Sequence, residues 1–537
     1  MAVEPEQIAP IDESAPDEET GMQLTIVWLL LIVTVCITYL LQRSGFSRIC
    51  PPSAVAMFLG IIVGVVVIRS DHLNPPEFSA EAFLYGLLPP IVFGAGFSMK
   101  KKKFFHNFGA IILFAVLGTV ISTIVFSLFT LMLVGMGAIK EENIGKNPAI
   151  KSFMYGSLIA AIDPVATLSV FSEMDAPPLL YNLVFGESVL NDAVAVVLFR
   201  TFEGFLGTEI TFTTIFWVIG KFFYISLGSL GVGILVALIC AFILKRFNPS
   251  GGDQSDGGHF DGTIYEISIV LMGAYMAYLV AESLELSGIV AIFFSGMCIA
   301  HYSYHNITID AQITMKKLVD VVVFLAETFV FEYLGLQVAL IKRSSVDIGL
   351  IVSGIPLCIV ARAANIFPLA YLANRFRRFP IPFRVQTMQW ACGLRGAVAY
   401  ALAAYMAKLP KAQPAEALET ATLIVVVVST IGFGGGTGPL MKWLKLQGAD
   451  DTDIANMGYD ELASGQGSPS ELRRMHQQEH EEVSALQARW DQFDNKYMKR
   501  YFGGQTTSRN NLLMPGNSMA ISDGELQMDS LSRKDSD

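Results

Sequence analysis

A carboxylate, an amide and a hydroxyl occur close together inside an apolar stretch of this chain. The segment reads Phe185-Gly-Glu-Ser-Val-Leu-Asn-Asp-Ala193. Because residues four apart share a helical face, Ser188 and Asp192 are predicted on one face, and Glu187 and Asn191 on the next. Oxygen atoms of these three types are hard ligands that suit an alkali cation. Burial penalises the charged form of a carboxylate, so Asp192 can hold either a proton or a cation, but not both at once.

A second acidic residue, Asp163, is followed by Pro164 near the middle of the preceding apolar stretch. Proline lacks a backbone donor and disfavours helix at the residue before it. The pair therefore predicts a helix that is interrupted inside the membrane and leaves backbone dipoles exposed. Such backbone is tolerated only where it lines a cavity or is buried in protein, and secondary transporters bind ions at interrupted helices. Competition between a proton and a cation for one carboxylate would be the minimal chemistry of an antiporter.

The elements that would carry these residues are membrane-spanning helices. The 537-residue chain is 53% hydrophobic and 16% charged, whereas soluble domains carry about 25% charged residues. A helix needs roughly 20 apolar residues to cross the hydrocarbon core. The composition excludes a large soluble protein and predicts an all-α polytopic membrane protein with thirteen apolar segments, at 23–42, 51–68, 80–98, 107–135, 152–171, 181–200, 222–244, 263–284, 287–302, 317–340, 348–373, 385–407 and 418–441.

An odd number of spans places the two chain ends on opposite sides of the membrane. Lys and Arg are more frequent in the loops on the side of the C-terminus, which predicts that this side is cytosolic. The predicted domains are an acidic luminal or extracellular tail at 1–22, a transmembrane domain at 23–445 and a cytosolic tail at 446–537. Residues 470–490 can form a polar helix, and 505–537 have the composition of a disordered segment. The net charge of −11 gives no basic footprint for nucleic acid, and a regulatory protein is a candidate partner of the tail.

Four ionisable residues lie near the middle of predicted spans: Asp163, Asp192, Arg362 and Arg395. Charges at this depth are costly and mark functional sites, although for the two arginines static buried ion pairs are the favoured explanation. Segments one to six and eight to thirteen would form two inverted six-helix repeats, in which the spans of Asp163 and Arg395 correspond. Two broken helices that cross there would have their dipole ends compensated by these opposite charges.

Five motifs carry a resemblance to a known family over residues 23–445. They are Leu87-Leu-Pro-Pro-Ile-Val-Phe93, Asp163-Pro-Val-Ala-Thr167, Phe185-Gly-Glu-Ser-Val-Leu-Asn-Asp-Ala193, Ala361-Arg-Ala-Ala-Asn365 and Gly393-Leu-Arg-Gly-Ala397. Together they closely resemble the eukaryotic sodium/proton exchanger family of monovalent cation/proton antiporters. Three more stretches are most similar to its organellar, endosomal and Golgi branch: His301-Tyr-Ser-Tyr-His-Asn306, Phe324-Leu-Ala-Glu-Thr328 and Phe433-Gly-Gly-Gly-Thr437.

The resemblance implies a role for each residue of the predicted site. Asp192 would carry the proton and the cation in turn, while Asp163 and Ser188 would help to line the site for the transported Na⁺ or K⁺. Asn191 would stand where electrogenic relatives have a second aspartate, which implies electroneutral one-for-one exchange. Glu187 would pair with Arg362 as a structural bridge.

The family also implies a homodimer that works by elevator-like alternating access, without a cofactor and without enzyme activity. The organellar branch implies regulation of luminal pH and cation content. Two positions depart from the family pattern. Gly94 replaces a larger residue in the inhibitor-linked stretch, which puts amiloride-type sensitivity in doubt, and Ile162 stands where some relatives have threonine. The basic cluster Lys100, Lys101, Lys102 and Lys103 is a candidate contact for anionic lipid, and positive-inside topology explains it equally well.

Four alternatives remain, one of which, a transport-dead scaffold, is disfavoured by the intact Asn191–Asp192 pair. A cation channel would need a continuous pore and a filter of carbonyls or like charges, and the sequence has no filter-like repeat. An intramembrane hydrolase could use Asp163 and Asp192 as a dyad that shares a proton, but Asn191 and the repeats do not serve that chemistry. A plasma-membrane sodium/proton exchanger is the alternative that differs only in location.

Overall fold

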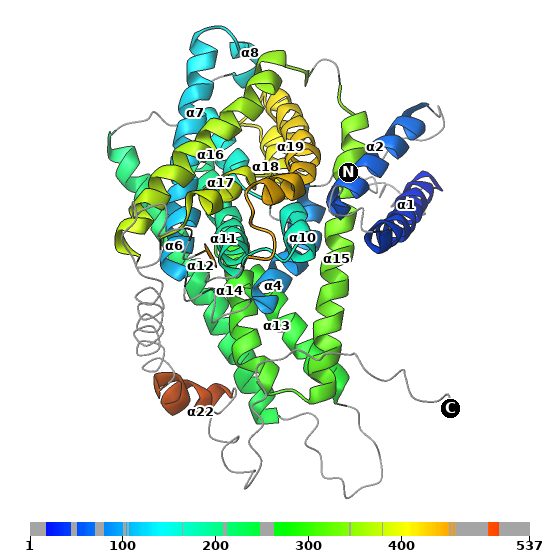
Figure 1. Ribbon diagram of the computed structural model, residues 1–537, viewed down its shortest axis with the longest axis vertical. Helices are drawn as coiled ribbons and strands as arrows, with labels where there is room; N and C mark the ends of the chain where they lie inside the picture. Colours follow the sequence, from blue (N-terminus) through cyan, green and yellow to red (C-terminus); the bar gives the residue numbers. More distant parts are fainter. Residues whose placement is uncertain are drawn as a thin grey trace, which may run out of the picture.

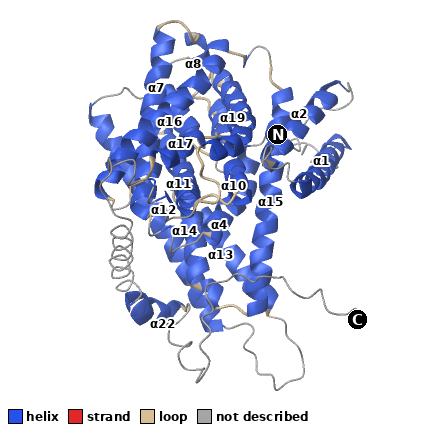
Figure 2. Cartoon of the chain, viewed as in Figure 1, coloured by secondary structure: helices blue, strands red, loops and turns tan. Residues whose placement is uncertain are grey.

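The computed structural model describes residues 18–44, 51–69, 80–99, 104, 107–145, 147–163, 165–207, 212–247, 262–342, 345–377, 380–449, 453–454, 457 and 492–503. Every regular element within these ranges is a helix (Figure 2). The predicted all-α class is therefore confirmed for the described part of the chain.

Each of the thirteen predicted apolar segments coincides with helical structure. The first half of the chain forms α1 (Glu18–Ser44), α2 (Pro52–Arg69), α3 (Ala80–Ala82), η2 (Phe83–Leu87), α4 (Leu88–Ser98), α6 (Phe108–Ile112), η3 (Leu113–Gly118), α7 (Thr119–Gly135), α8 (Glu141–Ile144), α9 (Pro148–Ala160), α10 (Val165–Glu173) and α11 (Pro178–Glu203). The second half forms α12 (Phe212–Phe247), α13 (Thr263–Ser283), α14 (Gly288–His301), η4 (Ser303–His305), α15 (Ile309–Ala339), α16 (Ile348–Phe376), α17 (Phe383–Ala391), α18 (Ala397–Lys408), α19 (Glu416–Trp443), η6 (Asp494–Met498) and α22 (Lys499–Phe502).

Nine helical segments of the described residues are long and apolar enough to cross a membrane. The multi-pass organisation is therefore confirmed, while the total of thirteen crossings stays a prediction. The difference arises because several predicted spans are short or interrupted as helices, such as α14 and the α17–α18 pair, and α15 carries several charged residues.

Several helices begin at residues whose chemistry favours a start. Pro52, Pro148 and Pro178 are the first residues of α2, α9 and α11, where the missing N–H would have had no helical partner. At the starts of α14 and α15, the side chains of Ser287 and Thr308 each accept a hydrogen bond from the backbone N–H three residues further on, at 3.4 Å.

The contacts between helices divide them into two groups, and Figure 1 labels most of these helices. In the first, here called the scaffold bundle, α15 packs along α2 and α4, and α14 packs along α4, α12 and α13. In the second, the core bundle, α9 contacts α7, α11 and α18, and α19 contacts α16 and α18. Helices α10 and α17 complete the core bundle through contacts with α11 and α19. This division matters because the candidate site lies between the two bundles.

Glycine allows α2 and α15 to approach closely in the scaffold bundle. A Cβ atom on Gly60 would overlap the backbone carbonyl of Glu332, and one on Gly335 would overlap the carbonyl of Met57. Small residues at helix contacts let membrane helices pack closely, because no hydrophobic effect drives their association in lipid. The two glycines lie on opposite helices, so the close approach is reciprocal and holds α15 firmly against α2.

A short segment of the C-terminal tail docks on the ends of α12 and α14. The Asp494 carboxylate, only 1% exposed, accepts a hydrogen bond from the Tyr302 hydroxyl at 2.8 Å and lies 3.0 Å from Nε2 of His301. At the other end of the segment, the Asn306 side-chain amide donates to the Phe502 carbonyl at 2.7 Å. The residues that receive the tail belong to the His301–Asn306 motif.

Replacing Asp494 with alanine should release this segment. Hydrogen bonds to charged groups contribute about 1.5–3 kcal/mol each. The equilibrium ratio of docked to undocked segment should therefore fall by about tenfold or more. Limited trypsin digestion at Lys499 and Arg500 measures the change, since docking holds the backbone carbonyls of both in hydrogen bonds from Lys245 Nζ, at 3.1 and 2.7 Å. Tyr501→Ala is the control, because Tyr501 is 59% exposed in the same helix. Equal cleavage of Asp494→Ala and wild type would show that Asp494 does not hold the segment.

Three predictions about the chain ends lie outside the described residues. They are the acidic tail before Glu18, the polar helix at 470–490 and the disordered composition at 505–537. The same holds for the predicted lipid-contacting cluster Lys100, Lys101, Lys102 and Lys103.

Candidate functional site

Two interrupted helices meet in the core bundle. The break between α9 and α10 contains Asp163, and the break between α17 and α18 contains Arg395. The backbone N–H of Asp163 donates a hydrogen bond to the carbonyl oxygen of Leu394 at 3.0 Å, which joins the two breaks directly. The predicted crossing of two broken helices is thus confirmed, and it brings together residues more than two hundred positions apart in the chain.

The second break supports the first through Arg395 and Gly396. The Arg395 side chain is 1% exposed, and its Nη1 donates to the carbonyls of Ala160 and Ala161 at 3.1 and 3.3 Å. These carbonyls form the negative end of the α9 dipole, so the guanidinium compensates that end. A Cβ atom on Gly396 would overlap the Asp163 side chain, which explains why glycine is needed at this contact.

Asp163 lies at the opposite, positive end of the neighbouring helix. Its Oδ1 accepts a hydrogen bond from the backbone N–H of Val165, the first residue of α10, at 2.9 Å. A carboxylate at a helix N-terminus is stabilised by the exposed N–H groups and by the helix dipole. Asp192 comes from α11 and is close enough to Asp163 for the two carboxyls to interact electrostatically.

Asn191 and Ser188 fasten the α9–α10 break to α11. The Asn191 Oδ1 accepts from the backbone N–H of Ile162 at 2.9 Å, and its Nδ2 donates to Thr119 Oγ1 at 2.5 Å. Thr119 in turn donates to the Ala115 carbonyl at 2.5 Å. The Ser188 hydroxyl donates to the Ile162 carbonyl. Both groups of the Asn191 amide are therefore occupied by the protein itself.

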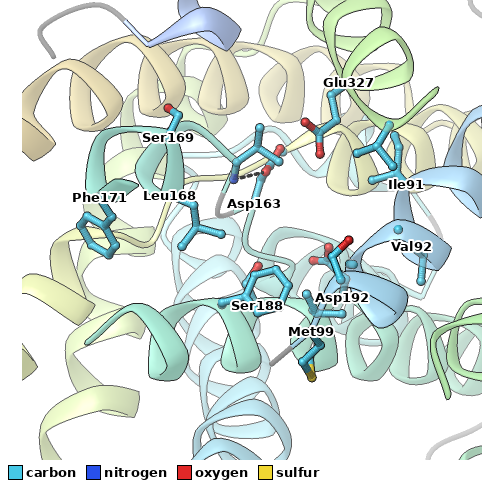
Figure 3. A pocket seen from close by; sticks show the side chains of 18 of the residues that line it. Ile91, Val92, Met99, Asp163, Leu168, Ser169, Phe171, Ser188, Asp192 and Glu327 are labelled. Carbon is cyan, nitrogen blue, oxygen red and sulfur yellow. Dashed lines mark hydrogen bonds between the residues drawn. The ribbon is translucent and has the colours of Figure 1, made fainter. Parts of the chain in front are cut away.

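A cavity of about 810 Å³ opens beside these residues and is lined by helices of both bundles. Its core-bundle wall includes Asp163, Ser188 and Asp192, and Figure 3 shows both carboxylates directed into it. The scaffold wall is mainly apolar but includes Glu327 and Asp320 of α15. The cavity therefore offers carboxylate and hydroxyl oxygens on one wall and carboxylates on the other.

Glu187 and Arg362 form a buried ion pair away from the cavity. Their side chains are 1% and 3% exposed, Arg362 Nη1 contacts Glu187 Oε1, and Nη2 lies 3.1 Å from Oε2. Gln389 of α17 completes the group, because its Nε2 donates to Glu187 Oε2 at 2.8 Å and its backbone carbonyl accepts from Arg362 Nη2 at 3.0 Å. The group links α11, α16 and α17.

The structure divides the predicted site residues into three sets. Asp163, Ser188 and Asp192 line the cavity, whereas Asn191 lies behind it, fully buried. Glu187, Arg362 and Arg395 hold helices of the core bundle in place. Gly94 lines the scaffold wall, where a Cβ atom would overlap Val323.

Four residues of the site were not found by reasoning from the sequence: Thr119, Gln389, Asp320 and Glu327. Of these, only Glu327 carries a sequence signal, because it lies in the Phe324–Thr328 stretch that is similar to the organellar branch of the family. Its position seven residues after Asp320 also places both on one face of a helix.

The family profile described as "Sodium/hydrogen exchanger, transmembrane" matches residues 30–443, which include both breaks and the whole cavity. This chain belongs to the sodium/hydrogen exchanger family. It is 34% identical to sodium/hydrogen exchanger 8 of Rattus norvegicus, over 98% of this chain and 91% of that protein. It is 35% identical to sodium/hydrogen exchanger 9 of Homo sapiens, over 91% of this chain and 82% of that protein. The similarity to exchanger 2 of Arabidopsis thaliana is 34%, over 92% and 94% of the two chains.

The fold of this exchanger is also found in a solved structure. The sodium proton antiporter MjNhaP1 from Methanocaldococcus jannaschii matches with a TM-score of 0.61 over 80% of this chain and 100% of that one. The two sequences are 20% identical, so this likeness concerns the fold. Family membership, the apolar helices and the shared fold together identify the chain as a multi-pass integral membrane protein of an antiporter family.

The arrangement in this exchanger places oxygen ligands of the kind that monovalent cations take at the cavity wall. Carboxylate oxygens of Asp163 and Asp192 and the Ser188 hydroxyl are hard ligands, and the cavity gives them access to water and ions. Protonation of the same carboxylates would remove the negative charge that a cation needs. A cation bound there would be the transported substrate and not a resident cofactor.

Proposed function

We propose that this exchanger carries Na⁺ or K⁺ in one direction and H⁺ in the other, with Asp192 as the group that binds each in turn. The observation that carries the proposal is the placement of Asp192 and Asp163 on the cavity wall beside two crossed helix breaks. Asp163 and Ser188 add oxygen ligands for the cation. Asn191 holds the break and adds no charge.

The transport cycle follows from the division into two bundles. The core bundle carries the ion site, and the scaffold bundle forms the opposite wall of the cavity. Movement of the core bundle past the scaffold would carry the loaded site across the membrane while the breaks stay joined. An empty, charged site is costly to move through an apolar barrier, so movement is coupled to occupancy by a cation or a proton.

The direct test is cation-driven proton efflux from proteoliposomes, comparing Na⁺, K⁺ and Li⁺. Flux that depends on an imposed cation gradient supports exchange and ranks the cations. Uncoupled current under voltage clamp, without proton flux, would favour a cation channel.

Exchange should be electroneutral, because the site holds one proton or one cation in each half-cycle. A net moving charge would feel about 2.3 kcal/mol per 100 mV of membrane potential. Clamping proteoliposomes at several potentials and measuring the final pH difference at fixed cation gradient tests this expectation. An end point that shifts with potential would reveal a second charged carrier, for which Asp163 is the first candidate.

The location and assembly of this exchanger are part of the proposal. The motifs at His301–Asn306, Phe324–Thr328 and Phe433–Thr437 support an endosomal or Golgi membrane, where exchange would regulate luminal pH and cation content. The proposed assembly is a homodimer in contact with membrane lipids, and a regulatory protein is proposed to bind the cytosolic tail. Plasma-membrane residence is the alternative, and imaging of the tagged chain against organelle markers separates the two.

A further inference from the structure

We propose that Glu327, on the scaffold wall of the cavity, receives the cation that enters from the cytosolic side and passes it to Asp163 and Asp192. The proposal rests on the proposed exchange function and assigns a step to a residue outside the core bundle. It makes Glu327 a determinant of cation affinity on one side of the membrane only.

The first support is the position of the Glu327 carboxylate. It lies in the cavity and points toward Asp163 and Asp192 from the opposite wall (Figure 3). The carboxyls of Glu327 and Asp163 are close enough to interact electrostatically. Among the described residues, no hydrogen-bond donor or basic side chain pairs with Glu327. Its oxygens are therefore available to an ion in the cavity.

The second support is a path that leads to Glu327. Asp320 also lines the cavity and is exposed, two helical turns earlier on α15. Seven residues at 1.5 Å each separate the two carboxylates by about 10 Å along the helix. The cavity is also lined by Ser98 and Met99 after α4, and by Asp175 between α10 and α11. The topology predicted from the sequence places the start of α15, the end of α4 and the loop between α10 and α11 on the cytosolic side.

The third support is the electrostatics of the cavity. Most of its scaffold wall is apolar, including Ile91, Val92 and Phe331. Acidic groups in a cleft with low-dielectric walls concentrate the field and raise the local concentration of cations. Two carboxylates spaced along one wall therefore favour entry of a cation and not of an anion.

Sidedness follows from the bundle to which Glu327 belongs. Helix α15 is held against α2 by the close contact at Gly60 and Gly335, so Glu327 stays with the scaffold. Asp192 belongs to the core bundle and would move away from Glu327 when the site turns to the other side. Glu327 can therefore contribute to cation binding only in the conformation described here, in which Asp192 lines the same cavity.

The test uses full-length protein in oriented proteoliposomes, with Na⁺ varied on one side at a time. Glu327→Gln should raise the half-saturating Na⁺ concentration on the cytosolic side by about tenfold, as expected for loss of one charge a few ångströms from the ion. The value on the luminal side should not change. Glu327→Asp, which keeps the charge, should stay close to wild type on both sides.

Glu332→Gln is the matched control, because Glu332 lies on the same helix and is buried where α15 packs on α2. It should leave both half-saturating concentrations unchanged. If Glu327→Gln does not fold, Asp320→Asn at the cavity mouth should still weaken cytosolic Na⁺ affinity. A wild-type value for folded Glu327→Gln, or an equal loss on both sides, would overturn the proposal.

A separate measurement distinguishes this inference from the proposed function. Thermal stabilisation of the purified protein by Na⁺ reports cation binding without transport. Glu327→Gln should need about tenfold more Na⁺ for the same stabilisation. If wild-type liposomes show no exchange, the proposed function fails, and this titration still decides whether Glu327 binds the ion. If exchange is normal and the titrations coincide, only the role of Glu327 is refuted.

Discussion

Asp192→Asn should abolish cation-driven proton flux in proteoliposomes while the protein still folds. Asparagine has nearly the same shape as aspartate, so the contacts of α11 are kept. It cannot take up or release a proton, and it offers no negative charge to a cation. Loss of the one carboxylate that binds both ions should therefore reduce exchange to the level of empty liposomes.

The control for this result is Glu332→Gln, an isosteric change of the same kind in a carboxylate on α15. Its exchange rate should equal that of wild type, and the melting temperatures of both variants should show that each is folded. Substantial pH-dependent exchange by folded Asp192→Asn would refute the one-site mechanism and make Asp163 the candidate carrier of the proton and the cation.

Arg362→Ala should lower stability more than any other single change considered for this protein. It leaves the Glu187 carboxylate, 1% exposed, with only the Gln389 amide for a partner. Removing one member of a buried ion pair costs about 3–5 kcal/mol, because the remaining charge is stranded. Thermal unfolding in detergent should show a clearly lower midpoint, together with reduced expression.

The double variant Glu187→Gln, Arg362→Gln is the informative comparison. It removes both charges, so it should be more stable than Arg362→Ala although two residues have changed. Glu187→Gln alone should also destabilise, since it strands the guanidinium. A single variant as stable as wild type would show that the pair does not hold α11 to α16.

The fold class of this exchanger could be predicted from local sequence. Long apolar stretches are only compatible with membrane helices, because lipid offers no partner for unpaired backbone groups. The helix break at Asp163 was also predictable, since proline acts on its immediate neighbour. Placement of Ser188 and Asp192 on one helical face depends only on helix periodicity, and both line the cavity.

The division of roles between neighbouring residues was decided by tertiary structure. Asn191 and Asp192 are adjacent in the chain, yet one hydrogen-bonds Ile162 and Thr119 while the other faces the cavity. Successive helical positions point about 100° apart, and only the packing of α11 against α9 and η3 determines which direction meets protein.

The partners of the buried charges likewise could not be predicted from local sequence. Arg395 compensates the end of α9 through carbonyls some 235 positions away, and Gln389 joins the Glu187–Arg362 pair from a third helix. Glu327 faces Asp163 across the cavity because two bundles meet there. The sequence by itself determined which residues carry charge into the membrane and where helices break. Which charges face each other, and which face the cavity, was decided by helix packing. Such contacts join segments that are far apart in the chain, so no local sequence pattern indicates them.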